Sequence, residues 1–308
     1  MGKLSAYIRL FRIEHALLLA VAVLLAELIA SAALKVPLPA LPLIICSLLV
    51  PVFIEMGSFA LNDYFDVKTD KANKRKDRPL ASGEIAPKSA LILAAVCYIL
   101  GIAAALPFAT VYVPCPLQVY PPCPAQHIFP SPAFAIVLLF AFLSLAYNFK
   151  LKELPLVGNI YIAASMAIPF IFGNFVISQT LYSPLLAMAA VAFFAGLGRE
   201  IMKSTEDMEG DVKHRNAKAL PVIIGEKNAL RASALCYILL IPLAFLPFAL
   251  GFPPNLPSLG LVALTAISFA FMARELIQKK PDLVALRKTS LLALGVGLLG
   301  YAAALLSI

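Results

Sequence analysis

Long runs of apolar residues alternate along the whole chain with short polar segments. A helix needs about 17–25 predominantly apolar residues to cross the hydrocarbon core of a bilayer. Nine runs reach this length, at approximately residues 14–34, 41–61, 89–109, 133–149, 157–177, 184–203, 232–250, 257–276 and 289–307. The pattern therefore predicts an all-α, polytopic membrane protein in which residues 1–308 form a single domain with nine transmembrane helices.

The composition also favours a chain embedded in lipid. Hydrophobic residues make up 61% of the sequence and charged residues 14%, whereas soluble domains carry about 45–50% and about 25%. This excess of apolar residues is too large for the core of a soluble protein, and the polar remainder is too small for a separate soluble domain. The first apolar run is long enough to stay in the bilayer, so we do not expect a cleaved signal peptide.

Basic residues lie almost entirely on one side of the predicted spans. With the N-terminus inside, the inside segments hold 24 of the 25 lysines and arginines, and Lys35 is the one that lies outside. Because cytoplasmic loops are enriched in lysine and arginine, the asymmetry predicts a multi-pass protein of the cell membrane with a cytoplasmic N-terminus. It also accounts for the net charge of +8 without a nucleic-acid partner. Two inside connections, 62–88 and 204–231, are long and carry both signs, so we expect the active site to face the cytoplasm.

The second apolar run ends in a cluster of acids. Asn62, Asp66 and Asp70 follow one another at intervals of four residues, and Asp63 lies three residues before Asp66. If the helix continues through them, all four side chains share one face. Carboxylates stacked at the mouth of an apolar span repel one another, so the cluster predicts a bound cation that offsets this cost.

A second acidic segment closes the sixth apolar run. Arg199, Lys203, Asp207 and Asp211 follow one another at intervals of four residues, so one helical stripe begins cationic and ends in two carboxylates. Magnesium prefers oxygen ligands and is typically bound by one or two carboxylates together with substrate phosphates. Two facing acidic helices therefore predict a diphosphate held through magnesium, with Arg78, Arg199 and Lys203 balancing the remaining charge. The alternative is that each motif is an ordinary solvated helix end with loop acids. That alternative could explain a single motif, but it explains two motifs on the same side less well.

These motifs resemble those of the UbiA superfamily of intramembrane prenyltransferases. The first segment matches the family's NDxxDxxxD motif at every fixed position, and the second matches its DxxxD motif. Residues 78–85 resemble the RPLxSGxI segment that follows the first motif, and Leu220-Pro221 fits the segment that follows the second. The resemblance covers essentially the whole chain, and the family has nine transmembrane helices.

The resemblance implies transfer of a prenyl group from its diphosphate to an acceptor, with Mg²⁺ as cofactor and a lipid-shielded cavity around the reaction. At its first helix the chain reads Arg12-Ile13-Glu14-His15, where the family often has Arg-Pro-x-Asn, and the tyrosine-plus-basic pattern after the fourth span is matched loosely by Tyr147, Lys150 and Lys152. The implied roles are metal binding by Asn62, Asp63, Asp66, Asp70, Asp207 and Asp211, catalysis by Asp66, Asp207 and Tyr147, and diphosphate binding by Arg12, Arg78, Lys150, Arg199 and Lys203.

The acceptor is specified less closely than the donor. The segment 199–211 resembles the branch of the family that makes digeranylgeranylglyceryl phosphate, in which the acceptor is the hydroxyl of geranylgeranylglyceryl phosphate, a precursor of ether lipids. An aromatic acceptor of quinone biosynthesis stays open, because those branches share parts of this segment. An ion-coupled transporter is a more distant alternative, since transporters place their acids near the bilayer midplane and not at the ends of spans. No protein partner is implied.

Two acids and two cysteines lie outside the motifs. Glu27 and Glu55 fall inside apolar runs, where a carboxyl group is costly. Glu55 precedes Asn62 by seven residues, so it shares a helix face with the first motif; a role in the substrate cavity and a structural role are both open for it. We expect Glu27 to be structural. Cys115 and Cys123 lie in an uncharged, proline-rich outside segment, where a disulfide and two free thiols are both open.

Overall fold

The protein is described by a computed structural model, which places residues 3–72, 75, 77–113, 126–206, 208 and 220–307. Within these ranges, nine helical segments are long and apolar enough to cross a membrane. They are Ile13–Leu34 (α2), Leu41–Ala72 (α3), Pro87–Ala105 (α4) continued by Leu106–Phe108 (η1), Pro132–Phe149 (α5), Val157–Ile177 (α6), Ser183–Glu206 (α7), Glu226–Leu243 (α10) followed by Leu246–Ala249 (α11), Leu256–Leu276 (α12), and Leu283–Ala304 (α13) continued by Leu305–Ser307 (η3). The predicted all-α fold with nine spans is confirmed.

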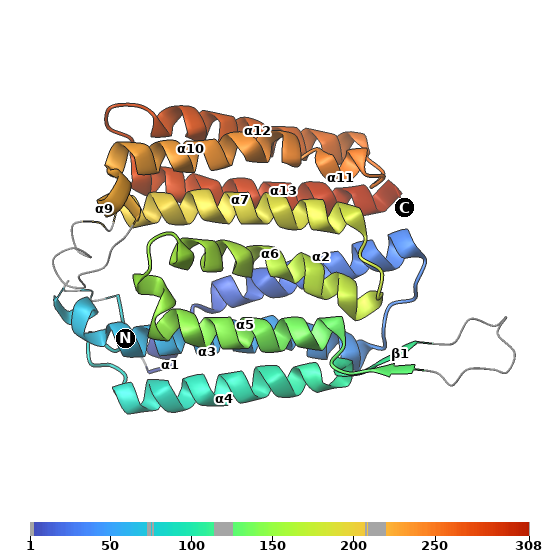
Figure 1. The fold of residues 1–308 in the computed structure, drawn as a ribbon, viewed down its shortest axis with the longest axis horizontal. Coiled ribbons are helices and arrows are strands. Elements are labelled where there is room, and N and C mark those ends of the chain that lie inside the picture. The colour runs from blue at the N-terminus through green and yellow to red at the C-terminus, as the bar shows by residue number, and fades with distance from the viewer. Residues whose placement is uncertain are drawn as a thin grey trace, which may run out of the picture.

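Short elements complete the described part of the chain. They are the N-terminal helix Lys3–Phe11 (α1), the 3₁₀ turn Leu151–Glu153 (η2), the helix Leu220–Ile224 (α9) and the strands Val111–Val113 (β1) and Gln126–Ile128 (β2). The two strands pair in antiparallel fashion. They form a small hairpin beyond the end of the bundle (Figure 1) and leave the all-α class unchanged.

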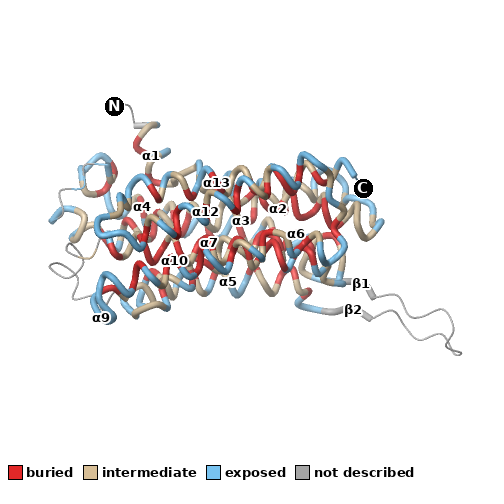
Figure 2. The backbone as a smooth tube through the Cα atoms, turned by 90° about the horizontal axis from the view of Figure 1, so that it is seen from above, coloured by how far each residue is buried: buried red, intermediate tan, exposed pale blue. Residues whose placement is uncertain are grey.

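The spans form an elongated bundle in which sequence neighbours usually pack side by side (Figure 1). Contacts run from α4 to α3, then to α2, α6 and α7, and on to α10, α12 and α13. Figure 2 shows that buried positions lie between the helices while exposed positions line the outside. Many exposed positions are leucine, isoleucine or phenylalanine, which is the surface expected where lipid replaces water as solvent.

The polar connections gather at one end of the bundle. Figure 1 places α1, the connection after α3, the connection between α5 and α6, and α9 at the same end, opposite the β hairpin and the C-terminus. This arrangement agrees with the prediction that the basic segments lie on one side of the spans. The assignment of that end to the cytoplasm stays a prediction from the charge asymmetry.

Several helices extend past the apolar runs from which they were predicted. Helix α3 continues from the predicted end near residue 61 to Ala72, α10 begins at Glu226 instead of near 232, and α13 begins at Leu283 instead of near 289. Charged residues end an apolar run without ending the helix, because helical backbone hydrogen bonds are satisfied within the segment in lipid and in water alike. The extensions place charged side chains in helices at the polar end.

Helices α2 and α6 approach each other closely at Gly173. A Cβ atom on this glycine would lie 2.7 Å from the carbonyl oxygen of Val23 and 2.8 Å from the side chain of Ala26. Small residues at such contacts let transmembrane helices pack backbone to backbone. The close contact fixes two of the walls of the cavity described below.

Candidate active site at the polar end of the bundle

The acids of the first motif lie on the last turns of α3. The helix continues through them to Ala72, as their predicted common face requires. Asp63 and Asp66 are buried, with 1% and 7% of their surface exposed, while Asn62 and Asp70 are partly buried. Burial of two carboxylates one helical turn apart is costly unless cations or donors face them.

Two arginines from different segments meet at Asp63. Arg12 donates from Nη2 to Oδ1 of Asp63 at 2.8 Å, and Arg78 donates from Nη1 to the same oxygen at 2.9 Å. Arg12 lies at the break between α1 and α2, in the left-handed region with φ of 45°, and its guanidinium also lies 4.2 Å from the ring centroid of Phe59. The second carboxylate oxygen of Asp63, Oδ2, is buried and has no hydrogen-bond partner among the described residues.

The loop after α3 is fixed to the bundle at both its apolar and its polar positions. Leu80 is buried, and Glu84 accepts two hydrogen bonds from Nη2 of Arg9 on α1, at 2.6 and 2.7 Å. Gly83 has φ of +82°, a conformation that glycine adopts without steric cost. The RPLxSGxI segment therefore forms a defined turn that holds Arg78 against Asp63.

A lysine from the connection between α5 and α6 pairs with the next acid. Lys152, in the 3₁₀ turn η2, donates to Oδ1 of Asp66 at 2.6 Å, and its ammonium lies 5.8 Å from the ring centroid of Phe65. Lys150, which the family resemblance assigned to the diphosphate, has 76% of its side chain exposed and lies 4.0 Å from Glu153. The structure thus brings Lys152, and not Lys150, against the first motif.

The second motif is described up to the end of α7. Arg199 pairs with Glu200 at 3.1 Å, and Lys203 lies 3.8 Å from the same carboxylate. Nε of Arg199 is buried and lacks a hydrogen bond within the described part of the chain. Asp207 and Asp211 lie outside the described residues. Glu200 belongs to the predicted motif but was not expected at the site, since its spacing does not match that of the other acids.

The described residues fit a magnesium ion that is shared with a phosphorylated ligand. No group of three acids, histidines or cysteines able to hold a metal occurs among the residues that were placed. Magnesium usually keeps several waters and takes one or two carboxylates together with substrate phosphates. The unsatisfied Oδ2 of Asp63 and the carboxylate of Asp66 on the same end of α3 supply the oxygen donors that such an ion prefers.

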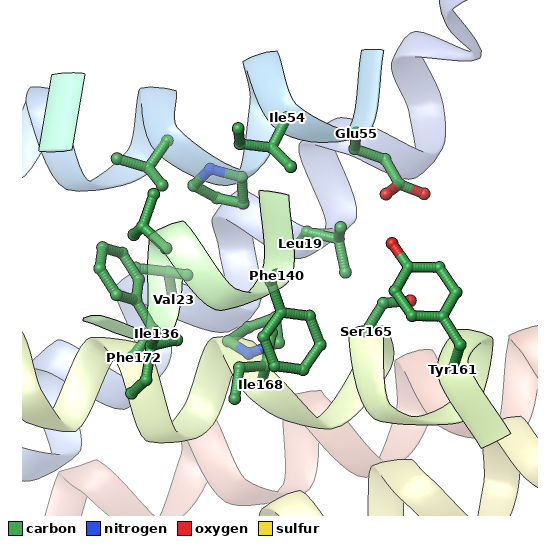
Figure 3. Close-up of a pocket in the computed structure, with 14 residues that line it drawn as sticks. Leu19, Val23, Ile54, Glu55, Ile136, Phe140, Tyr161, Ser165, Ile168 and Phe172 are labelled. Carbon is green, nitrogen blue, oxygen red and sulfur yellow. The ribbon is translucent and has the colours of Figure 1, made fainter. Parts of the chain in front are cut away.

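An apolar cavity lies between α2, α3, α5 and α6, and the charge of Arg12 acts on Glu55 in its lining. It encloses about 520 Å³ of empty space, counted to its open mouth. Figure 3 shows Glu55 of α3 and Tyr161 of α6 at one end of the cavity and Val23, Ile136 and Phe172 at the other. Glu55 is the one charged residue among the described residues that line it.

Tyr147 stands beside this end of the cavity. Its ring stacks on that of Tyr161, with ring centroids 4.8 Å apart and an interplanar angle of 26°. Tyr147 therefore lies close to the cavity wall, next to a tyrosine that the sequence had not singled out. In a span with several aromatic residues, spacing alone does not show which ring faces the cavity.

A second apolar cavity lies between α2, α6, α7, α12 and α13. Its empty space, open solvent included, is about 850 Å³, and Leu19 lines both cavities. Its described polar lining consists of Thr265 and Tyr301. Both hydroxyls donate to backbone carbonyls, at 3.0 Å for Thr265 with Leu261 and 2.9 Å for Tyr301 with Ala244, so the lining suits hydrocarbon.

The described part of the chain has nine apolar helical segments, an acid–arginine cluster and an apolar cavity. These features define a class of intramembrane protein that takes a ligand with an anionic head and an apolar tail. The chain belongs to the UbiA prenyltransferase family, whose model matches residues 19–294. The digeranylgeranylglyceryl phosphate synthase of Archaeoglobus fulgidus is 34% identical over 257 residues, 82% of this chain and 80% of that protein. The protein of the same name from Methanopyrus kandleri is 32% identical over 86% of this chain and 88% of its own.

Solved structures share this fold. One structure of digeranylgeranylglyceryl phosphate synthase has a TM-score of 0.74 at 24% identity and covers 100% of both chains. A UbiA homologue from Archaeoglobus fulgidus bound to GPP and Mg²⁺ has a TM-score of 0.61 at 18% identity and covers 96% of this chain and 99% of its own. At these identities the likeness establishes the arrangement of helices, and the chemistry has to be argued from this chain's residues.

Proposed function

We propose that the protein transfers a geranylgeranyl group from its diphosphate to the hydroxyl of geranylgeranylglyceryl phosphate, in a magnesium-dependent step of ether-lipid synthesis. The observation that supports the prenyl diphosphate donor is the cluster of Arg12, Arg78 and the buried Asp63, in which Arg12 also acts on Glu55 in the wall of the apolar cavity. The names of the archaeal relatives support the acceptor. Structures of a UbiA homologue with GPP or DMAPP and Mg²⁺ support the donor class and the ion.

Arg12 and Arg78 form the diphosphate subsite in this proposal. Each guanidinium has five N–H donors and uses one nitrogen on Asp63. Charge-assisted bonds from the other nitrogens to phosphate oxygens are among the stronger hydrogen bonds in proteins. Asp63 orients the two arginines toward one point, and Lys152, paired with Asp66 at 2.6 Å, brings a third cation to the same rim. Lys150, Arg199 and Lys203 remain candidates for balancing the rest of the negative charge on the diphosphate.

Magnesium is assigned to the acids of the two motifs. Asn62, Asp63, Asp66 and Asp70 on α3 would hold it together with Asp207 and Asp211, and the unpartnered Oδ2 of Asp63 supports this assignment. When bound, magnesium offsets the negative charge that grows on a leaving diphosphate. Asp66 and Asp207 would take part in catalysis by holding the magnesium that offsets this charge.

The cavity separates the allylic carbon from water. Once the carbon–oxygen bond of the donor weakens, the allylic group carries positive charge, and a water-excluding site protects it until the acceptor arrives. Tyr147 and Tyr161, stacked at the cavity end, could stabilise that charge through the ring faces. The polar end would face the cytoplasm, as the basic connections favour.

A turnover assay on the purified full-length protein tests the proposal. Geranylgeranyl diphosphate and magnesium are supplied with geranylgeranylglyceryl phosphate and, in a parallel reaction, with 4-hydroxybenzoate. We expect prenylated product from the glyceryl phosphate alone. Product from the aromatic acid would move the protein to the quinone branch, and no transfer of the prenyl group to either acceptor would overturn the assignment.

A further inference from the structure

We propose that Glu55 accepts the proton of the acceptor hydroxyl, and that the hydroxyl of Tyr161 holds the acceptor oxygen beside it. The proposal rests on the proposed function, because it requires an alcohol acceptor and a prenyl diphosphate in this cavity. It adds a catalytic residue that neither acidic motif contains.

The position of Glu55 matches the place where the two substrates must meet. It precedes Asn62 by seven residues on α3, which puts it on the same helix face and about 10 Å further along the axis. It lines the apolar cavity. The reacting carbon of a prenyl diphosphate lies between the diphosphate and the hydrocarbon tail, so it must lie between the arginine cluster and this cavity.

Two further polar groups face Glu55 across the cavity. Figure 3 shows its carboxylate directed toward the hydroxyl of Tyr161, with Ser165 one turn further along α6. An alcohol oxygen placed between α3 and α6 could accept from Tyr161 while donating to Glu55. Helix α3 thus contributes the hydrogen-bond acceptor, Glu55, and helix α6 contributes the donor, Tyr161, of a site for a hydroxyl group.

Proton transfer to Glu55 requires an ionised carboxylate, which burial in an apolar cavity disfavours and a nearby cation favours. Arg12, which donates to Asp63, acts on Glu55 as a favourable opposite charge. The titratable groups that face Glu55 from the other helices are tyrosines, namely Tyr98 on α4 and Tyr161 on α6, with Tyr147 of α5 stacked on the latter. Arg12 therefore links the diphosphate subsite with the acid at the cavity mouth.

A carboxyl group in an apolar, membrane-embedded cavity carries a cost that function usually explains. Glu27 offers a contrast within the same protein. It is fully buried between helices, and it does not line the cavity. Glu55 instead borders the space where the substrates are expected.

Transfer to an alcohol acceptor releases the hydroxyl proton, which a neighbouring base can take. The bond between the first carbon of the prenyl chain and the diphosphate oxygen breaks, and its electron pair leaves with the diphosphate. A lone pair of the acceptor oxygen forms the new carbon–oxygen bond, and the hydroxyl proton passes to a carboxylate oxygen of Glu55. Water takes the proton from Glu55 when the products leave, so the carboxylate is restored. A positioned base typically contributes about 10²–10⁴-fold to such a step.

The test compares E55Q with wild-type protein and with E27Q, a matched change at a buried glutamate outside the cavity. The turnover number with both substrates, the affinity for geranylgeranyl diphosphate with magnesium, and the pH profile are measured for each. E55Q should lower kcat by about 100-fold or more, leave donor affinity unchanged and lose the rise of activity with pH. E27Q should resemble wild type. Y161F should raise KM for the acceptor and leave donor affinity unchanged.

E55D keeps a carboxylate at the site and is the second variant. It should retain the pH dependence with a kcat between those of wild type and E55Q, and it decides the question if E55Q does not fold. Wild-type kcat in E55Q, loss of the pH dependence in E55D, or a loss of activity explained by weaker donor binding would overturn the role of Glu55 alone. A wild-type protein that transfers no prenyl group to the glyceryl phosphate would overturn the proposed function and this inference together.

Discussion

Replacing Asp63 by asparagine tests the arginine cluster on Oδ1, together with the proposed magnesium ligand Oδ2, with little change of shape. The carboxylate accepts one hydrogen bond from Arg12 and one from Arg78, both on Oδ1. Its side chain is fully buried, and the two arginine side chains are each 20% exposed. In the D63N variant two cations face a neutral amide, so both arginines lose the charge that orients them.

The expected loss follows from this geometry. Removing one partner of a buried ion pair costs about 3–5 kcal/mol of folding stability, and removing one partner of a buried, hydrogen-bonded charge pair at a binding interface costs about 2–5 kcal/mol of binding free energy. The lower end applies here, because the amide oxygen still accepts a hydrogen bond and the guanidiniums are partly hydrated. A loss of about 3 kcal/mol from transition-state binding corresponds to a fall of about 100-fold in kcat/KM, at about 1.4 kcal/mol for each factor of ten.

The assay measures kcat/KM for the prenyl diphosphate at saturating acceptor, with thermal unfolding in detergent as a check of the fold. D77N is the comparison variant at the exposed edge of the same cluster. Asp77 has 59% of its side chain exposed, the hydrogen bond from Arg75 lowers its pKa below the ordinary value, and it lies 3.8 Å from Nε of Arg78. Because this contact with Arg78 is long and exposed, its removal should change kcat/KM by less than about twofold, as for most exposed pairs. A D63N protein with near-normal kcat/KM would refute the role of the cluster, as would a loss that simply follows unfolding.

Three further predictions concern the same rim. K152A should lower kcat/KM for the prenyl diphosphate by about tenfold, since Lys152 is a partly buried cation on Asp66, and K150A should have little effect; equal losses in the two variants would contradict the assignment. D66A and D207A should each abolish turnover without preventing membrane insertion, and near-normal, metal-dependent activity in either would contradict the two-motif mechanism. Removal of metal with EDTA should stop product formation and added magnesium should restore it, whereas turnover that persists in EDTA would exclude a magnesium requirement.

The sequence predicted the fold well because lipid imposes a strong constraint. A span must be long, apolar and helical, so nine runs of residues translated directly into nine helical segments in the described chain. The ends of the helices were predicted less well. Residues such as Arg231 and Arg287 interrupt hydropathy while the helices α10 and α13 continue through them.

The site was predictable where its residues share one helix. Asp63 and Asp66 follow from helical spacing, and the structure places both in α3 as expected. Contacts between distant segments were not predictable from spacing. Lys152 reaches Asp66 because the 3₁₀ turn after α5 presents it instead of Lys150, and Tyr161 faces Glu55 because α6 packs across the cavity from α3.

The most direct test of the central claim is a structure of the protein with magnesium and the unreactive thiolo analogue of geranylgeranyl diphosphate. The account predicts that Arg12 and Arg78 donate to the diphosphate and that the chain enters the cavity between α2, α3, α5 and α6, past Glu55. A diphosphate bound away from the two arginines, or a chain that lies in the cavity between α7, α12 and α13, would contradict it.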